Sequence, residues 1–391
     1  MDKTTARRIY DSLIYLISCA LAGEKPQPEL ITGDISQILN YARYHSLTAL
    51  AVSALSSAGL ASDSATAERN MAIRKIMLLD AERENILAKM RENEIKYMVL
   101  KGVIIKDLYP FIGDRQMSDN DILFEADARK SVRDVMLSLG YDIESYGQGN
   151  HDVYIKQPVY NFEMHSSLFD SYSNPDLHSY FSTALDKAKV GDNELSRVMT
   201  DEDYYIYIKA HEYKHYSAGG TGIRSLVDTF VYLKAKESKL NRTYIEAELE
   251  KLGLLDYERS TAALAFKIFD HAFALENMRA HQAENYSDPL SSSEREMLDV
   301  FFLSGSYGTT KQMVENEIKQ KTKDGKGAKF KYVLSHVFPP MEFYKSNFPF
   351  FYKHKILIPF LVIARIFGML LLRPRTTFTK LKTAMKYNKK G

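Results

Sequence analysis

The sequence is poor in cysteine, glycine and proline, and each shortage excludes a class of protein. Cys19 is the single cysteine among 391 residues, which excludes an intramolecular disulfide and any cysteine-clustered zinc or iron–sulfur site. Glycine contributes 19 residues and proline 11, too few for a low-complexity or fibrous chain. One cysteine fits a reducing compartment, and we expect a cytoplasmic location.

The remaining composition is that of an ordinary globular protein. Hydrophobic residues make up 45% of the chain and charged residues 26%, close to globular averages. This balance excludes wholesale disorder and a polytopic membrane protein. The length predicts two to three domains with sizeable cores.

Charge is distributed unevenly along the chain. The net charge is +2, but the residues from Lys353 onward include ten basic and no acidic residues, so the preceding 352 residues carry a net charge of −8. The apolar run 356–372 within this tail would form a helix of about 25 Å, shorter than a hydrocarbon core of about 30 Å. Arg365, Pro359 and Gly368 interrupt it. We therefore expect residues 353–391 to make peripheral contact with an anionic membrane. The alternatives are a buried helix with a solvated basic end and, less favoured, a true span.

The N-terminus permits two interpretations. Arg7 and Arg8 precede a short apolar run that ends at Cys19, as in a lipoprotein signal, but Asp11 and Tyr15 interrupt the run. The apolar residues recur at helical spacing, so an amphipathic helix is the favoured interpretation.

Hydrophobic periodicity divides the chain into four parts. We predict a helical N-terminal region over 1–92, a mixed-sheet domain over 93–195, a helical domain over 196–345 and a basic amphipathic tail over 346–391. Residues 317–331 are rich in lysine and predict a solvated loop. The fold class is α+β, because short β-rich runs alternate with helical stretches in the second part. The expected strands are 97–100, 121–124, 153–155 and 160–165, and the expected helices between them are 103–108 and 126–139.

Two carboxylates at the head of an expected strand are the first sign of chemistry. Asp119 and Asp121 lie two residues apart, so the period of a strand places both side chains on one face. Such a pair can hold two divalent cations, and oxygen ligands suit Mg²⁺. An exposed turn is the alternative interpretation of the same pattern.

Flanking residues strengthen the interpretation as a site. Lys101 and Gly102 join an expected strand to an expected helix, where free N–H groups and the lysine could bind phosphate. Glu163 and His165 alternate on a later strand, so Glu163 could supply a third carboxylate. A structural ion pair is the alternative for Lys101, and pairing with Asp114 or Asp119 is the alternative for Arg115.

The order of these motifs resembles the nucleotidyltransferase superfamily with the DNA-polymerase-β-type catalytic fold, and in particular its branch of uncharacterised bacterial nucleotidyltransferases. The resemblance covers roughly residues 30–265. It rests on motifs spread over the expected sheet and helical domains: Leu100-Lys101-Gly102, Tyr109-Pro110, Arg115, Asp119-x-Asp121, Glu163-x-His165, His211, Lys214, His215, the loop 219–222, Ile223-Arg224 and Asp228.

The resemblance implies a site that transfers a nucleoside monophosphate from a nucleoside triphosphate (NTP), with ATP the expected donor. It implies that Asp119, Asp121 and Glu163 bind Mg²⁺ or Mn²⁺ and act in catalysis. The wider superfamily has Gly-Ser at the turn where this chain has Lys101-Gly102, so Lys101 and Arg115 are the natural charges for the leaving pyrophosphate. The other residues expected to contact the nucleotide or the acceptor are Gly102, Ser118, His165, His211, Lys214, His215 and Arg224.

The helix that carries two of these histidines also matches a zinc-protease pattern. His211-Glu212-x-x-His215 has the spacing in which Glu212 would be a general base. We favour the nucleotidyltransferase interpretation because it accounts for more of the chain. Arg224 and Asp228, four residues apart, would form a salt bridge unless Arg224 contacts phosphate.

The sequence thus predicts a metal-dependent nucleotidyltransferase that releases pyrophosphate. The acceptor hydroxyl could belong to a protein, a sugar, a small molecule or RNA. Two alternatives remain open at this point: an inactive nucleotide-binding or regulatory protein on the same fold, and the toxin of a toxin–antitoxin pair that modifies tRNA or protein.

Overall fold

The computed structural model describes residues 3–31, 33–283, 286–306, 308–321, 328–372 and 374–386. Within these residues the strands form one seven-stranded sheet in the order β3-β4-β5-β2-β1-β7-β6. Strands β2 and β5 are parallel neighbours at its centre, and β1 pairs with β2 antiparallel and with β7 parallel. The strands are β1 (Tyr97–Val99), β2 (Asn120–Phe124), β3 (Asp142–Ser145), β4 (His151–Lys156), β5 (Tyr160–His165), β6 (Lys189–Val190) and β7 (Ser196–Val198).

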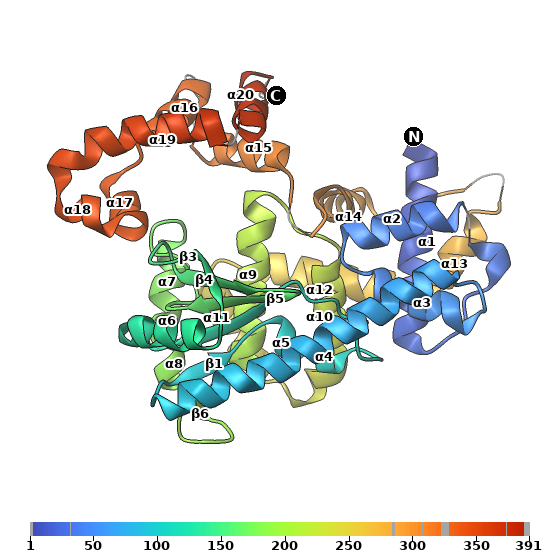
Figure 1. The fold of residues 1–391 in the computed structure, drawn as a ribbon. Helices are drawn as coiled ribbons and strands as arrows, with labels where there is room; N and C mark the ends of the chain where they lie inside the picture. The colour runs from blue at the N-terminus through green and yellow to red at the C-terminus, as the bar shows by residue number, and fades with distance from the viewer. Residues whose placement is uncertain are drawn as a thin grey trace.

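Alternate residues of the central strands face two different helical layers. Ile122 and Phe124 pack under the long helix α4 (Asp63–Glu92) and under α6 (Arg129–Ser138), with residues such as Ile86 and Val132. Leu123 faces the opposite layer of helices, and it packs in the main hydrophobic core that is described next. Figure 1 shows α4 running along the underside of the sheet. Asp121 shares the parity of Leu123, so the site lies on the face away from α4.

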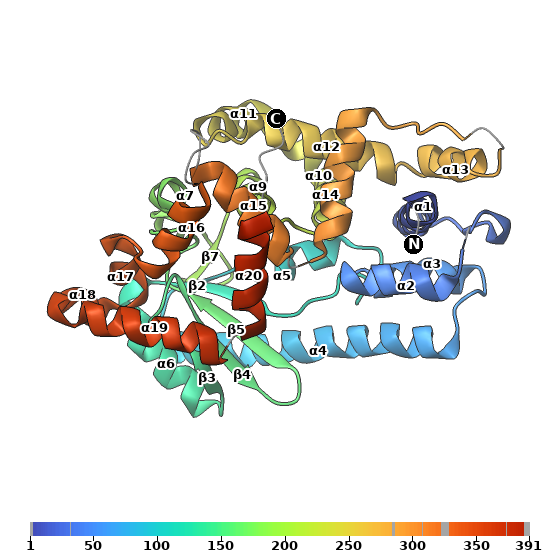
Figure 2. The same ribbon diagram turned by 90° about the horizontal axis from the view of Figure 1, so that it is seen from above.

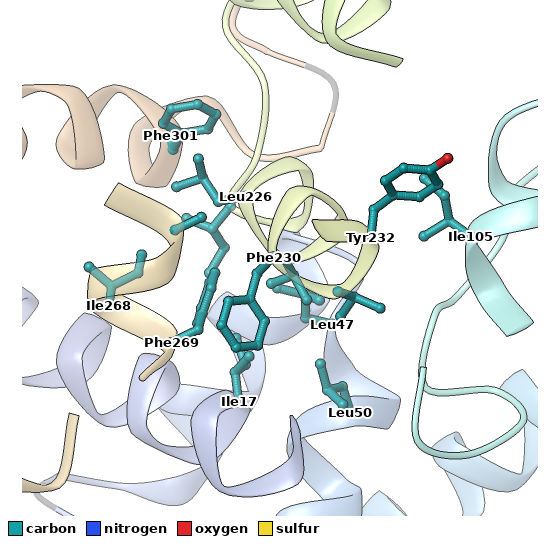
Figure 3. Close-up of a cluster of buried hydrophobic side chains, with 14 of the residues drawn as sticks. Ile17, Leu47, Leu50, Ile105, Leu226, Phe230, Tyr232, Ile268, Phe269 and Phe301 are labelled. Atoms are coloured by element: carbon teal, nitrogen blue, oxygen red, sulfur yellow. The ribbon is translucent and has the colours of Figure 1, made fainter. Parts of the chain in front are cut away.

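The main hydrophobic core joins the N-terminal helices to the second half of the chain. Helices α1 and α12 bring Ile17 and Phe269 together around Phe230 of α10 (Figure 3). All three side chains are buried. The helices of this body are α1 (Lys3–Ala22), α2 (Ile35–Tyr44), α3 (Thr48–Ser57), α9 (Asp201–Ala218), α10 (Arg224–Lys236), α11 (Arg242–Lys251), α12 (Leu255–Phe269), α13 (His271–Ala280) and α14 (Ser292–Ser304).

Short helices connect the strands to each other and to the body. Helix α5 is a single turn directly after β1, and η2 continues it. The short elements are η1 (Pro28–Leu30), α5 (Gly102–Ile105), η2 (Lys106–Leu108), η3 (Ala126–Ala128), α7 (Pro175–Phe181), α8 (Ala184–Lys187) and η4 (Glu237–Lys239).

The last helices form a segment with its own small cores, which we call the C-terminal arm (residues 310–321, 328–372 and 374–386). Figures 1 and 2 show it on the opposite side of the sheet from α4. One cluster gathers around Tyr332 and another around Tyr344. No helix among the described residues is long and apolar enough to cross a membrane. The arm consists of α15 (Thr310–Lys321), α16 (Ala328–Val337), α17 (Met341–Asn347), α18 (Pro349–Lys353), η5 (Lys355–Leu357), α19 (Ile358–Leu372) and α20 (Pro374–Lys386).

The structure confirms the expected mixed α+β fold and the expected strands to within two residues at each end. The helix expected at the N-terminus is confirmed as well, and it lies in the main core. The loop expected over 317–331 is wrong at both ends, because α15 continues to Lys321 and α16 begins at Ala328. The rest of that prediction, residues 322–327, lies outside the described residues. Strands β3, β6 and β7 were not expected.

The packing of α12 gives a stability prediction with a control on the same helix. Phe269 is 1% exposed in the main core, whereas Phe266 is 39% exposed. We expect Phe269→Ala to lower the free energy of unfolding by about 3–5 kcal/mol, because it removes buried apolar surface and leaves a cavity. Phe266→Ala should cost less than half of that. Denaturant titrations of both variants measure the difference, and equal losses would contradict the assignment of Phe269 to the core.

Candidate active site

The parallel pairing of β2 and β5 brings two acids side by side. Asp121 is the register partner of Glu163, and Leu123 is the partner of His165. Asp119 precedes β2, which begins at Asn120. The chain therefore presents three carboxylates on the same face of the sheet, as the two-residue spacing predicts.

Asp121 lies at the centre of a buried hydrogen-bond network. The Nζ of Lys101 lies 2.5 Å from its Oδ1, and the Nε2 of His165 lies 2.8 Å from the same oxygen. The side-chain amide of Asn150 is 3.4 Å from the Nδ1 of His165, so Nε2 carries the proton that Asp121 accepts. These contacts lower the pKa of Asp121 despite its burial. Its Oδ2 has no hydrogen-bond partner among the described residues.

The turn that supplies Lys101 has an unusual backbone. Lys101 has φ +49°, a conformation that non-glycine residues rarely adopt. The hydroxyl of Tyr204 donates to the Lys101 carbonyl at 2.5 Å and supports the turn. A Cβ at Gly102 would lie 2.3 Å from the guanidinium of Arg115, so only glycine leaves room for that arginine. The helix that follows has a single turn. The charge of Lys101, rather than a helix dipole, would therefore attract an anion to this turn.

Arg115 pairs with neither Asp114 nor Asp119, the two alternatives considered from the sequence. Its Nε and Nη2 each donate to the Asp228 carboxylate at 2.8 Å, and Asp228 also accepts from the hydroxyl of Tyr109 at 2.7 Å. The salt bridge expected between Arg224 and Asp228 is therefore wrong. Arg224 instead donates to the backbone carbonyl of Gln116 at 3.3 Å.

All twelve residues predicted for the site line one cavity of about 370 Å³. Ser118 lines it too, and its backbone carbonyl accepts from Lys75 at 3.3 Å. The twelve residues are Lys101, Gly102, Arg115, Ser118, Asp119, Asp121, Glu163, His165, His211, Lys214, His215 and Arg224.

The cavity has an acidic and a basic part. Burial and the nearby charges of Asp121 and Glu163 raise the pKa of Asp119, which has no hydrogen-bond or ion-pair partner among the described residues. Burial and the charge of Lys101 lower the pKa of Lys214 on α9, and burial lowers that of Arg224 as well. Asp119, Lys214 and Arg224 each lack an ion-pair partner among the described residues, so the cavity holds unpaired charge of both signs and fits a cation beside an anion.

One further histidine joins the acids. His151 of β4 is the register partner of His165, and its Nε2 lies 3.8 Å from the Oε2 of Glu163. One ligand atom each from His151, Glu163 and His165 lie within 4.8 Å of one another. His151 was not predicted as a site residue, because the strand expected here began at Val153, whereas β4 begins at His151. A strand two residues longer would have placed His151 on the face of Glu163.

The zinc-protease interpretation of α9 is wrong, because its glutamate belongs to the protein core. Glu212 accepts from Lys209 at 3.0 Å and from the hydroxyl of Tyr257 at 2.7 Å. His211 and His215 lie together, with 3.3 Å between their Nε2 atoms. Among the described residues no third ligand accompanies these two histidines, and Glu212 is not free to act as a base.

Comparison with known proteins agrees with this geometry. The family model described as "Uncharacterised nucleotidyltransferase" matches residues 32–270. The chain belongs to this nucleotidyltransferase family. The match covers the sheet, the twelve cavity residues named above and helices α9 to α12, and the family implies an NTP substrate. No match is found among curated proteins or among solved structures.

The buried ion pair of Lys209 and Glu212 gives a prediction that tests whether Glu212 has a structural or a catalytic role. Lys209 is fully buried and Glu212 is 8% exposed, so Glu212→Gln leaves an uncompensated buried ammonium. We expect a loss of about 3–5 kcal/mol in the free energy of unfolding. Glu92→Gln, which breaks the exposed pair with Lys89, should cost less than about 1 kcal/mol. Denaturant titrations measure the free energy of unfolding of both variants. An unchanged free energy of unfolding for Glu212→Gln would contradict its structural role.

Proposed function

We propose that this nucleotidyltransferase moves a nucleoside monophosphate from an NTP to an acceptor hydroxyl, with release of pyrophosphate, in a reaction that depends on a divalent cation. The observation that carries the proposal is the set of unpaired carboxylate oxygens in the acidic part of the cavity. Asp119 and the Oδ2 of Asp121 have no partner among the described residues. Uncompensated carboxylates in a confined site bind cations well.

Asp119, Asp121 and Glu163 are the residues that would hold the metal ions. Carboxylate oxygens suit Mg²⁺, and the imidazole of His151 beside Glu163 is a nitrogen donor that also suits Mn²⁺. Bound there, two cations would neutralise charge on the phosphate and on the attacking and leaving oxygens.

The basic part of the cavity would bind the triphosphate. Lys214 and Arg224 come from different helices and face the cavity with positive charge that no ion pair neutralises within the described residues. Arg115 adds charge but is held in place by Asp228. Such positioned cations stabilise the charge that develops on a leaving pyrophosphate. ATP is the donor we expect.

In the proposed step the acceptor oxygen forms a bond to the α-phosphorus while the bond from that phosphorus to the bridging oxygen of pyrophosphate breaks. The proton of the acceptor hydroxyl passes to the carboxylate of Glu163. Asp119 and Asp121 keep the reacting groups in line. The acceptor is a protein, a sugar, a small molecule or RNA, and the reaction takes place in the cytoplasm, where NTPs are available.

One observation favours a second candidate function. Lys101 neutralises Asp121 at 2.5 Å, a contact that could serve in place of a cation. In that case the protein binds nucleotide without turnover and acts as a regulatory protein on the same fold. The two functions differ in whether any nucleotide is transferred.

Labelled nucleotides distinguish the two candidates. We expect label from α-phosphate-labelled ATP, but none from γ-phosphate-labelled ATP, to become attached to protein, RNA or small molecules of a cell lysate. The label should require Mg²⁺ or Mn²⁺. Melting curves with each NTP provide the binding control, because a ligand at 100 times its Kd stabilises by about 2.7 kcal/mol. Metal-dependent NTP binding without any transfer would favour the regulatory protein, and transfer of the γ label would contradict nucleotidyl transfer.

The two neighbouring acids should differ in their effect on stability. Because its pKa is raised, ionised Asp119 destabilises the free protein at neutral pH, so Asp119→Asn should leave the melting temperature unchanged or higher. Asp121 has a lowered pKa and its charge stabilises the fold. Asp121→Asn should therefore cost about 3–5 kcal/mol, since it leaves Lys101 without a counter-charge.

Both variants should lose transfer activity by roughly two to three orders of magnitude. Melting curves and labelling assays on the same preparations give the two readouts, with Asp107→Asn, an exposed acid paired with Lys106, as the control. Activity that survives in Asp119→Asn would refute the proposed metal ligands. A drop in melting temperature for Asp119→Asn would contradict its unpaired state.

A further inference from the structure

One face of helix α19 in the C-terminal arm is apolar and exposed. Phe360, Ile363, Phe367 and Leu371 follow one another at spacings of three and four residues, so they form a single stripe along the helix. Their exposed fractions are 69%, 54%, 59% and 75%. Helices that face water normally carry polar residues on the outer face, so this stripe needs a cover.

The opposite face of α19 already has its partners. Leu361 and Val362 pack with Tyr344 in one of the small cores of the arm. Arg365, the single charge within 356–372, is directed to this inner side. Its guanidinium lies 4.6 Å from the centre of the Phe343 ring and donates to the carbonyl of His336 at 3.4 Å. The charge that argued against a membrane span is therefore directed away from the outer stripe.

Exposed lysines precede and follow the stripe along the chain. Lys353 and Lys355 precede α19, Lys382 and Lys386 lie on α20, and all four are exposed. The sequence holds no acidic residue from Lys353 onward. A symmetric contact between the stripes of two copies would bring these like charges together, which disfavours a dimer formed through this face. An apolar surface rimmed by negative charge, the chemistry of an anionic lipid bilayer, complements it.

We propose that the C-terminal arm docks on the surface of an anionic membrane, with Phe360, Ile363, Phe367 and Leu371 inserted among the lipids and the lysines at the headgroups. Helix α19 has 15 residues and is about 22 Å long, too short to span about 30 Å of hydrocarbon, so it lies along the interface. This inference does not depend on the proposed transfer reaction.

The arm is joined to the sheet domain close to the cavity. The hydroxyl of Ser346 donates to Asp170 at 2.6 Å, and its carbonyl accepts from the backbone N–H of Gly149 at 3.3 Å. Asn150, next to Gly149, lines the cavity. A docked arm would thus hold the active site near the bilayer, on the side of the arm shown in Figure 1.

Vesicle flotation of the full-length protein tests the proposal. We expect the protein to float with phosphatidylcholine vesicles that contain phosphatidylglycerol, and to remain below pure phosphatidylcholine vesicles. Added salt should weaken the binding, because it screens the lysines.

Two pairs of variants separate the apolar from the charged contribution. Phe360→Gln/Phe367→Gln should weaken vesicle binding by more than about tenfold, whereas Met71→Gln/Met77→Gln, which changes two residues on α4 that are 63% and 61% exposed, should not. Lys353→Gln/Lys355→Gln should weaken it roughly fivefold per charge. The matched control is Lys25→Gln/Lys239→Gln, at two exposed lysines of the body. Melting curves confirm that each variant is folded.

Three outcomes would overturn the inference. They are equal flotation with neutral and anionic vesicles, binding that Phe360→Gln/Phe367→Gln leaves unchanged, and a dimer in analytical ultracentrifugation that the same variant dissociates. The last result would identify a second copy of the chain, rather than lipid, as the cover of the stripe. NTP binding by wild-type protein is measured separately, so failure of vesicle binding leaves the proposed transfer reaction standing.

Discussion

The buried carboxylate of Asp121 is the constraint on which the site depends. A carboxylate removed from water is stable only if opposite charge or hydrogen bonds compensate it, and here Lys101 and His165 do so. Both partners reach Asp121 only because β2 lies between β1 and β5 in the sheet. Three features support these two hydrogen bonds to Asp121. They are the turn at Lys101, the register of β2 with β5 and the histidine tautomer set by Asn150.

The compensation is local and incomplete. Lys101 and His165 compensate one oxygen of Asp121, but Asp119 lies nearby with a raised pKa and no partner among the described residues. Lys214 and Arg224 also line the cavity, and nearby cations make their positive charge less favourable. A site built only for stability would place these charges together. The lack of ion pairs among them costs stability and leaves the cavity ready for a ligand that carries charges of both signs.

Much of this arrangement could be predicted from the sequence, because local patterns carry it. The two-residue spacing of Asp119 and Asp121 predicts that both face the same side. The order of the motifs predicts that residues from three regions of the chain share one cavity, as they do. What the sequence could not show are partners chosen by tertiary packing. Asp228 lies 113 residues from Arg115 and was paired instead with its neighbour Arg224. The pattern His211-Glu212-x-x-His215 permitted a catalytic role for Glu212, because the sequence does not show that Glu212 is buried against Lys209 and Tyr257. Strand β3 was missed because Asp142 and Glu144 are exposed and polar at the edge of the sheet.

The contact between Arg115 and Asp228 has a mechanical consequence. It joins the segment between η2 and β2 to helix α10, and Tyr109 reinforces it from the same side. Any hinge motion that drew α10 away from the sheet would leave a buried guanidinium without its counter-ion, at a cost of about 3–5 kcal/mol. The two walls of the cavity therefore behave as one rigid block. Substrates must enter a preformed opening, and selection among them rests on shape and charge already in place rather than on closure of the two walls.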